Sequence, residues 1–385
     1  MKTNLKKLLY SGVTFMSLGG LAACSSTSSS TTTSSSAATS QTSVATISNN
    51  STSSDSSSST IDWSALPTTE VTLSNDGLKI TEGGTYILTG STTAGVTVET
   101  DANVRIILAG AEISSSDTAA INVINADNVE LEIKDGTTNT VKDTSNHTDT
   151  NIEGAIHVEA DLTITGNGSL TVEGNFQDGI VSTDDLVVNS GNITVTAVDD
   201  GIRGKDSLTI NGGTINVTAG GDGIKSTNDT DTTKGYTTIT GGEITVKAGD
   251  DGIKAETALT IDGGTITVSE SAEALEGTNI TINGGTLDVY GSDDAINASS
   301  TTSSDIYIKV TGGDLKVAVG SGDTDAFDAN GDIYISGGTI AVTAPTSAFD
   351  FDGTAELTGG TVTVNGEQIT QITATGPGAG GHGGW

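Results

Sequence analysis

The chain has 385 residues, and its 49 aspartates and glutamates against 15 lysines and arginines give a formal net charge of −34. A chain this acidic excludes nucleic acid and anionic membrane surfaces as direct partners, because both carry the same sign of charge. Only 3% of the residues are aromatic, which argues against an ordinary globular core but not against a solenoid core of stacked aliphatic side chains.

Residues 1–23 have the pattern of an export signal. Three lysines precede an apolar stretch that ends in Leu21-Ala22-Ala23-Cys24, and this stretch is too short and too poorly flanked to span a membrane. The ending resembles the bacterial lipoprotein cleavage box, which implies cleavage before Cys24 and lipid on its thiol. A secreted protein with a spare thiol is the alternative. Cys24 is the only cysteine, so no disulfide can form within the chain.

Cleavage there would remove three of the 15 bases and no acid, leaving 12 bases against 49 acids and a net charge of −37. Residues 24–60 would then be a lipidated cysteine followed by a tether, since 27 of the 36 residues from 25 to 60 are Ser or Thr and cannot form a core. The expected location is the extracellular face of the cell membrane, with the lipid as the only membrane contact. Residues 376–385 form a Gly-rich tail, disordered by composition.

Residues 61–139 are rich in β-type runs of weak periodicity. The predicted strands are 70–73, 84–88, 96–99, 104–108 and 129–133. They suit the irregular first coils or cap that the end of a solenoid needs, with regular stacking under way by Thr85. Residues 143–151 are polar throughout and are predicted to be a loop that leaves the stack.

A repeat governs the rest of the chain. A glycine precedes each β-type run, and the glycines follow one another at steps of 23, 22, 29, 22, 21, 28, 25 and 22 residues. They are Gly168, Gly191, Gly213, Gly242, Gly264, Gly285, Gly313, Gly338 and Gly360. Such a period indicates stacked units.

Each unit predicts three short strands and three turns. In Thr214-Ile215-Asn216-Val217 the apolar and polar residues alternate, as in a half-buried strand. Units of about 22 residues that stack at roughly 4.8 Å predict an all-β parallel β-helix, a solenoid with three strands per coil, over residues 61–375. A leucine-rich horseshoe fits poorly, because no unit carries a helical stretch or an LxxLxLxxN signature. We expect a monomer.

Acidic residues recur at the turn before the second strand of each coil. The row comprises Asp178, Asp200, Asp222, Asp251, Glu273, Asp294 and Asp325, and Asp199, Asp250 and Asp293 double it from the position before. Stacked carboxylates repel by about 1 kcal/mol in water and about 3.5 kcal/mol at an effective dielectric of 20. Protonation, adjacent cations or bound metal can relieve this. Oxygen ligands without His or Cys favour Ca²⁺, and Asn228, Asp229 and Asp231 could add ligands. The alternative is that the aspartates make turn hydrogen bonds to backbone N–H groups.

A basic strip lies three residues further along the coils, at Arg203, Lys225 and Lys254. Over calcium, the strip would grip uronate carboxylates. A lysine of lowered pKa could instead act as the base of a β-elimination. The simpler alternative is a set of salt bridges between coils.

Tyrosines on strands otherwise made of Thr suit stacking against sugar rings. Tyr236 and Tyr307 occupy equivalent positions, Tyr334 lies two places on, and Tyr290 lies on a first strand. Singly exposed tyrosines are also common on protein surfaces. The three histidines are scattered along the chain and suggest no metal site or catalytic triad.

Three segments together resemble a family of secreted carbohydrate-binding β-helix proteins, over about Val71 to Val364. They are TEGGTYILTGSTTAGVTVETDANVRIILAGAEISSSDTAAINV, EGAIHVEADLTITGNGSLTV and DDGIRGKDSLTINGGTINV. The resemblance implies a right-handed parallel β-helix, similar in shape to calcium-dependent pectate lyases, that binds calcium, cellulose and acidic plant polysaccharide. It implies function for the DDGI-type turns at Asp199, Asp200, Asp222, Asp250 and Asp251. Later coils depart from the pattern, with AEAL and SAF in place of DDGI.

The sequence therefore predicts a lipid-anchored extracellular protein that binds calcium and polysaccharide, such as cellulose or polygalacturonate, without catalysis. The predicted metal ligands are Asp178, Asp199, Asp200, Asp222, Asp250, Asp251, Asp293 and Asp294. The predicted carbohydrate contacts are Arg203, Lys225, Lys254, Tyr236 and Tyr307. A calcium-dependent uronate lyase and a structural adhesin are the alternatives.

Overall fold

The computed structural model describes residues 61–322 and 324–375. The predicted signal peptide, Cys24, the Ser/Thr-rich segment and the Gly-rich tail lie outside these residues. Within them there is no α-helix, and one 3-10 turn, η1 (Trp63–Ala65), precedes 34 strands that form a single sheet. None of the described helical segments has the length and apolarity needed to span a membrane.

The strands are β1 (Thr68–Leu73), β2 (Leu78–Ile80), β3 (Gly84–Thr92), β4 (Val96–Glu99), β5 (Val104–Ser114), β6 (Ile121–Asn125), β7 (Asn128–Ile133), β8 (Thr138–Lys142), β9 (Gly154–Val158), β10 (Asp161–Thr165), β11 (Ser169–Gly174) and β12 (Asp178–Ser182). They continue as β13 (Asp185–Val188), β14 (Asn192–Ala197), β15 (Ile202–Gly204), β16 (Ser207–Ile210), β17 (Thr214–Ala219), β18 (Ile224–Ser226), β19 (Tyr236–Ile239), β20 (Glu243–Lys247), β21 (Ile253–Ile261), β22 (Thr265–Glu270) and β23 (Leu275–Ile282). The last are β24 (Thr286–Gly291), β25 (Ile296–Ala298), β26 (Tyr307–Val310), β27 (Asp314–Val319), β28 (Asp325–Ala329), β29 (Asp332–Ile335), β30 (Thr339–Thr343), β31 (Ser347–Phe351), β32 (Ala355–Leu357), β33 (Thr361–Val364) and β34 (Glu367–Ile369).

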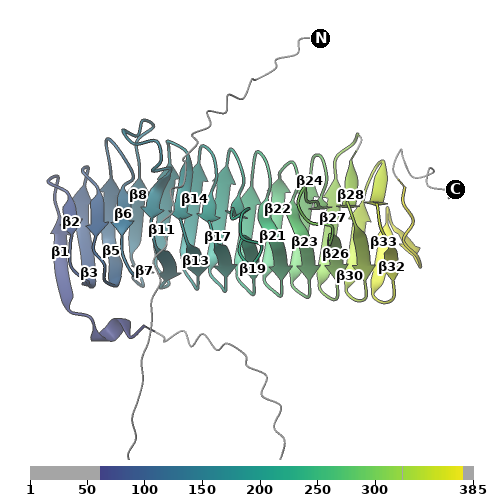
Figure 1. Cartoon of the computed structure of the whole chain (residues 1–385), viewed down its shortest axis with the longest axis horizontal. Coiled ribbons are helices and arrows are strands. Elements are labelled where there is room, and N and C mark those ends of the chain that lie inside the picture. Colours follow the sequence, from purple (N-terminus) through teal and green to yellow (C-terminus); the bar gives the residue numbers. More distant parts are fainter. Residues whose placement is uncertain (1–60, 323, 376–385) are drawn as a thin grey trace, which may run out of the picture. The chain divides into compact units, whose positions relative to one another are not determined.

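From β1 to β33 the strands pair in parallel with the equivalent strands of the neighbouring coils, where a coil is one round of three strands. The last strand, β34, pairs antiparallel with β33. The three rows are represented by β12–β15–β18, β13–β16–β19 and β14–β17–β20. Figure 1 shows the coils side by side in chain order, from β1 at one end to β33 at the other. Within the described residues a nearly all-β fold with a mostly parallel sheet is thus confirmed, and the pairing is consistent with the predicted parallel β-helix.

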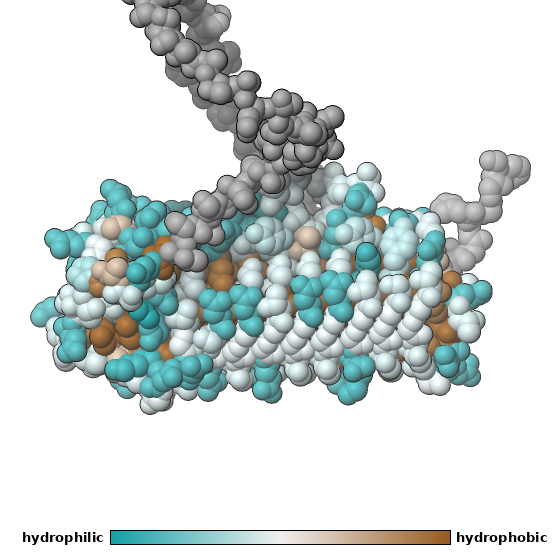
Figure 2. All heavy atoms as spheres, turned by 90° about the horizontal axis from the view of Figure 1, so that it is seen from below, coloured by the Kyte–Doolittle hydropathy of each residue, from teal (hydrophilic) through white to brown (hydrophobic). Residues whose placement is uncertain are grey.

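The core is built by the alternation seen in the sequence. In β14 and β17 every second side chain is buried and the others are exposed, because successive side chains of a strand point to opposite faces. The buried positions stack from coil to coil. One such ladder contains Ile193, Ile215, Ile244, Ile266, Leu287, Leu315, Ile340 and Val362. On the outside, Figure 2 shows regular rows of weakly polar residues, with hydrophobic residues visible between the rows and near both ends of the stack.

The glycine-rich turns allow the coils to approach closely. Gly213 has a φ of 100°, a conformation that residues with a Cβ adopt only under strain. A Cβ at Gly213 would also lie 2.8 Å from the carbonyl oxygen of Gly191 in the preceding coil. The turn therefore requires glycine for both its dihedral angle and its space.

Parallel pairing begins at β1, where Thr68 pairs with Thr85, in agreement with regular stacking under way by Thr85. One other segment differs from the sequence prediction. The segment 143–151 does not simply leave the stack, because the side chains of Asp143 and His147 are fully buried. The His147 ring stacks on Phe176 at a centroid distance of 4.3 Å. The polar composition of residues 143–151 therefore does not indicate an exposed loop throughout. The buried Asp143–His147 pair attaches the segment to the coils.

Candidate functional site

The acidic row lies where the sequence places it, and four of its carboxylates cap the turn of the following coil. Asp178, Asp200, Asp222 and Asp251 are all buried. The backbone N–H of Asp200 donates to Oδ1 of Asp178 at 3.1 Å, and that of Asp222 donates to Oδ1 of Asp200 at 3.0 Å. The N–H of Asp251 then donates to Oδ1 of Asp222 at 2.9 Å. The turn hydrogen bonds that the sequence left open are therefore present.

The pattern resumes further along the stack, where the N–H of Asp325 donates to Oδ1 of Asp294 at 2.7 Å. Asp294 is half-buried, and Asp293 beside it is exposed. The row thus continues into coils that no longer carry a DDGI turn.

The basic strip is also in register, since Arg203 pairs with Lys225 and Lys225 pairs with Lys254 along β15, β18 and β21. Each base lies between two carboxylates. Nζ of Lys225 is 2.6 Å from Oδ2 of Asp200 and 2.9 Å from Oδ2 of Asp222.

The two flanking bases have the same arrangement. Arg203 bonds Asp178 at 2.7 Å and also contacts Glu153. Lys254 bonds Asp251 at 2.7 Å and also contacts Glu276. The salt bridges between coils are therefore present. The three bases offset part of the negative charge of Asp178, Asp200, Asp222 and Asp251.

Burial shifts the acid–base equilibria of the site. It raises the pKa of Asp178 to about 6, although the guanidinium of Arg203 opposes the shift. Burial alone would lower the pKa of Lys225, but the carboxylates of Asp222 and Asp200 outweigh it and raise that pKa. Burial, followed by the neighbouring Asp251, raises the pKa of Glu273 to about 8. The bases are thus held charged, whereas some acids are pushed towards the neutral form.

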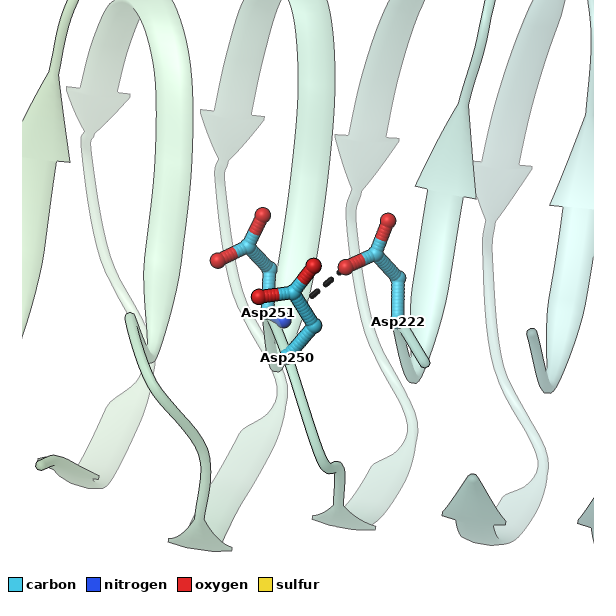
Figure 3. Close-up of side chains that lie close together, drawn as sticks. All are labelled: Asp222, Asp250 and Asp251. Carbon is cyan, nitrogen blue, oxygen red and sulfur yellow. Dashed lines mark hydrogen bonds between the residues drawn. The ribbon is translucent and has the colours of Figure 1, made fainter. Parts of the chain in front are cut away.

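One group of three carboxylates could hold a metal ion. Asp222, Asp250 and Asp251 each offer an oxygen within 4.8 Å of the other two. Figure 3 shows them converging from two successive coils, with the hydrogen bond from the Asp251 N–H to Asp222. Oδ1 of Asp251 is buried and accepts no hydrogen bond, and Asp250 is exposed. Ligand capacity remains here, because a carboxylate has about four acceptor sites.

Asp199 lies beside this group. A Cβ at Gly221 would lie 2.3 Å from Oδ1 of Asp199 and 2.9 Å from Oδ1 of Asp200. Gly221 stands at the position that Asp199 and Asp250 occupy in the neighbouring coils, and its missing side chain leaves room for the carboxylate oxygens of Asp199 and Asp200. Asn228, by contrast, is engaged in its own turn, where its Oδ1 accepts the N–H of Asp231 at 3.0 Å.

The tyrosines occupy the predicted equivalent positions. Strand register places Ala258 and Asn279 between Tyr236 and Tyr307 in one row across β19, β21, β23 and β26. Tyr334 pairs with Lys309, two places further along. Tyr236 is 38% exposed, so its ring is accessible from solvent.

A groove that the sequence did not predict lies at Tyr236. It has a volume of about 890 Å³ and lies among residues 229–238, 254–260, 276–279 and 299–303. Two long turns border it, residues 227–235 and 299–306. The steps of 29 and 28 residues between repeat glycines mark these turns, so the repeat spacing contained the signal.

Comparison with known proteins gives three findings. The family model of carbohydrate-binding domain-containing proteins matches residues 74–326. A carbohydrate-binding domain-containing protein of Acetivibrio thermocellus is 33% identical over 135 residues, which are 33% of this chain and 47% of that protein. The chain thus spans about half the length of this curated relative.

A solved structure is similar as well. It is that of the polysaccharide lyase-like protein from C. thermocellum, a gadolinium derivative, with a TM-score of 0.53 and 32% identity. The match covers 57% of this chain and 95% of the other. Because the family model covers more than half of the chain, the protein belongs to the family of carbohydrate-binding domain-containing proteins.

Proposed function

We propose that the protein is a lipid-anchored extracytoplasmic protein that binds calcium and recognises a polysaccharide such as cellulose or polygalacturonate, without turnover. The family match over residues 74–326 carries this proposal. The scaffold is a right-handed parallel β-helix, which the parallel pairing of equivalent strands supports. Its rigid outer faces can hold side chains at a regular spacing along an extended polymer.

Calcium would bind at Asp222, Asp250 and Asp251. The convergence of their oxygens and the unbonded Oδ1 of Asp251 support this choice. Calcium accepts carboxylates, carbonyls and water in a flexible shell. When bound, the ion supplies positive charge that a uronate carboxylate can approach.

The two proposed polysaccharides would use different contacts. Polygalacturonate would depend on bound calcium and on Arg203, Lys225 and Lys254. Cellulose would depend on flat stacking against Tyr236 and Tyr307. Ionic contact weakens with salt, whereas stacking on an aromatic ring does not depend on counter-ions in the same way.

A glycan array probed with calcium and with chelator tests the proposal. We expect binding to polygalacturonate only with calcium, and binding to cellulose fragments under both conditions. Failure to bind any glycan under either condition would refute the proposed function.

A second candidate is a calcium-dependent uronate lyase. The description of the structural neighbour as polysaccharide lyase-like favours it. Production of unsaturated uronate from polygalacturonate distinguishes it from a binding protein.

Anchoring rests on the Leu21-Ala22-Ala23-Cys24 box. Incorporation of labelled palmitate into the wild type and into Cys24→Ala tests it. Equal labelling of the two proteins would contradict the anchor.

A further inference from the structure

Two long turns on coils that are not neighbours enclose the groove. Residues 227–235 join β18 to β19, and residues 299–306 join β25 to β26. In the two intervening coils the chain continues through the same corner as β21 and β23, without a turn of this kind. The flanking strands β19 and β26 are three strand spacings apart, about 14 Å. The volume of about 890 Å³ falls within the range of ligand pockets.

Both turns are braced by their own side chains. Oδ1 of Asn228 accepts the N–H groups of Thr230 at 3.2 Å and Asp231 at 3.0 Å. Oγ of Ser300 accepts the N–H of Ser303 at 3.1 Å. A ligand would therefore meet walls that are already formed, which lowers the entropy lost on binding.

The groove carries unbalanced negative charge. Asp229, Asp231 and Glu256 line it, and none of them forms an ion pair with a basic side chain in residues 61–322 and 324–375. Lys254 also lines the groove, but its Nζ is 2.7 Å from Oδ2 of Asp251 and also contacts Glu276. The one lining base thus already bonds two carboxylates, one of which, Glu276, also lines the groove. Lys234 attracts Asp231 at longer range, but its Nζ is bonded to Asp206, so the groove keeps an excess of negative charge.

An accessible aromatic ring stands at one wall. Tyr236 on β19 lines the groove and is 38% exposed. The next residues in its row are Ala258 and Asn279, both smaller than tyrosine. The ring can therefore be reached from the floor of the groove.

We propose that this groove binds a glycan whose sugars carry free amino groups, such as a chain of glucosamine units. The inference rests on the carbohydrate-binding function proposed above and adds a place and a ligand class. Protonated amines would pair with Asp229, Asp231 and Glu256, and one sugar ring would lie on Tyr236. A uronate chain would instead bring its carboxylates against three carboxylates.

Calorimetric titration of the full chain at mildly acidic pH, where the sugar amines are protonated, tests the proposal. The probes are hexamers of glucosamine, N-acetylglucosamine, glucose in β-1,4 linkage and galacturonate. We expect the glucosamine hexamer to bind most tightly, to weaken with added salt, and to lose about tenfold in affinity in the double variant Asp229→Asn and Glu256→Gln. Tyr236→Ala should also lose about tenfold, whereas Tyr236→Phe keeps the ring and should bind.

Matched controls separate the groove from the general acidity of the protein. The double variant Asp76→Asn and Glu82→Gln removes the same charge from exposed sites outside the groove, and Tyr290→Ala removes a ring that is 37% exposed on β24. Both control variants should bind the glucosamine hexamer with an affinity within about twofold of the wild type. Equal losses in the groove and control variants, or tighter binding of the glucose or galacturonate hexamer, would overturn the groove assignment while leaving carbohydrate binding intact. If no glycan binds, the proposed function fails with it.

Discussion

Nζ of Lys225 lies 2.6 Å from Oδ2 of Asp200, across the boundary between two coils. The same ammonium is 2.9 Å from Asp222, so one charge serves two buried carboxylates. Lys225→Met would leave both without a counter-charge in a site of low exposure. We expect a loss of about 3 to 5 kcal/mol in the free energy of unfolding, measured by urea denaturation in chelator.

Lys316 provides the matched control. Its Nζ is 3.2 Å from Asp288, and both side chains are mostly exposed. Lys316→Met should cost less than about 1 kcal/mol. Similar losses in the two variants would contradict the role assigned to the strip.

The regular part of the fold could be predicted because its signals repeat. The alternation in Thr214–Val217 determines which residues are buried, because a register shift of one residue would turn every side chain to the opposite face of the sheet. The aligned turns determine the positions of the acidic row. The pairing of Arg203 with Glu153, 50 residues earlier, could not be predicted. It depends on the path of an irregular segment. The burial of Asp143 and His147 could not be predicted either, because a polar composition normally indicates an exposed loop.

The turn at Gly213 gives a test of close packing between coils. Gly213→Ala imposes a positive φ on alanine and places its Cβ 2.8 Å from the carbonyl oxygen of Gly191. Together these should cost about 3 kcal/mol of stability. Gly110 has a φ of 87°, but no atom lies within 4 Å of the position that a Cβ would take there. Gly110→Ala should therefore reduce the free energy of unfolding by only about 1 to 2 kcal/mol. Thermal unfolding of both variants measures the difference, and equal costs would exclude a contribution from the contact with Gly191.

Asp328 makes stability depend on pH. Burial, and then the charges of Asp294 and Asp325, raise its pKa from 3.8 to about 7. Between these values the folded state binds the proton more tightly than the unfolded state, so the stabilising contribution is present at low pH and is lost as pH rises through about 7. With chelator present, the urea midpoint should fall from mildly acidic to mildly alkaline pH, and the fall should be smaller in Asp328→Asn.

Asp332 is the control for this pH series. The backbone N–H of Thr354, followed by the Tyr334 hydroxyl, lowers its pKa. Asp332 therefore stays ionised over the whole pH series. Asp332→Asn should leave the slope of the urea midpoint against pH unchanged. A slope that is the same in Asp328→Asn and the wild type would contradict the assignment.

Calcium should stabilise the folded chain by mass action, because the three carboxylates converge only when two coils are stacked. At a free concentration a hundredfold above the dissociation constant, the gain is about 2.7 kcal/mol. Asp250→Asn removes the exposed carboxylate of the group and should reduce the calcium-dependent rise in melting temperature. Asp314→Asn, an exposed change on β27, should not. No rise in the wild type after exhaustive chelation and calcium readdition would rule out the site.

Turnover of polygalacturonate is not expected, because β-elimination needs a base that is free to take the proton next to the uronate carboxylate. Lys225 and Lys254 are the lysines placed for this role. Each bonds two carboxylates, and although burial opposes the shift, these carboxylates raise the pKa of both lysines. At neutral pH both amines therefore remain protonated and have no lone pair to offer. With polygalacturonate and calcium supplied, the ultraviolet absorbance of unsaturated uronate should stay at the level of a protein-free sample. A sustained rise that is lost in Lys225→Ala or Lys254→Ala would instead assign the protein to the lyases.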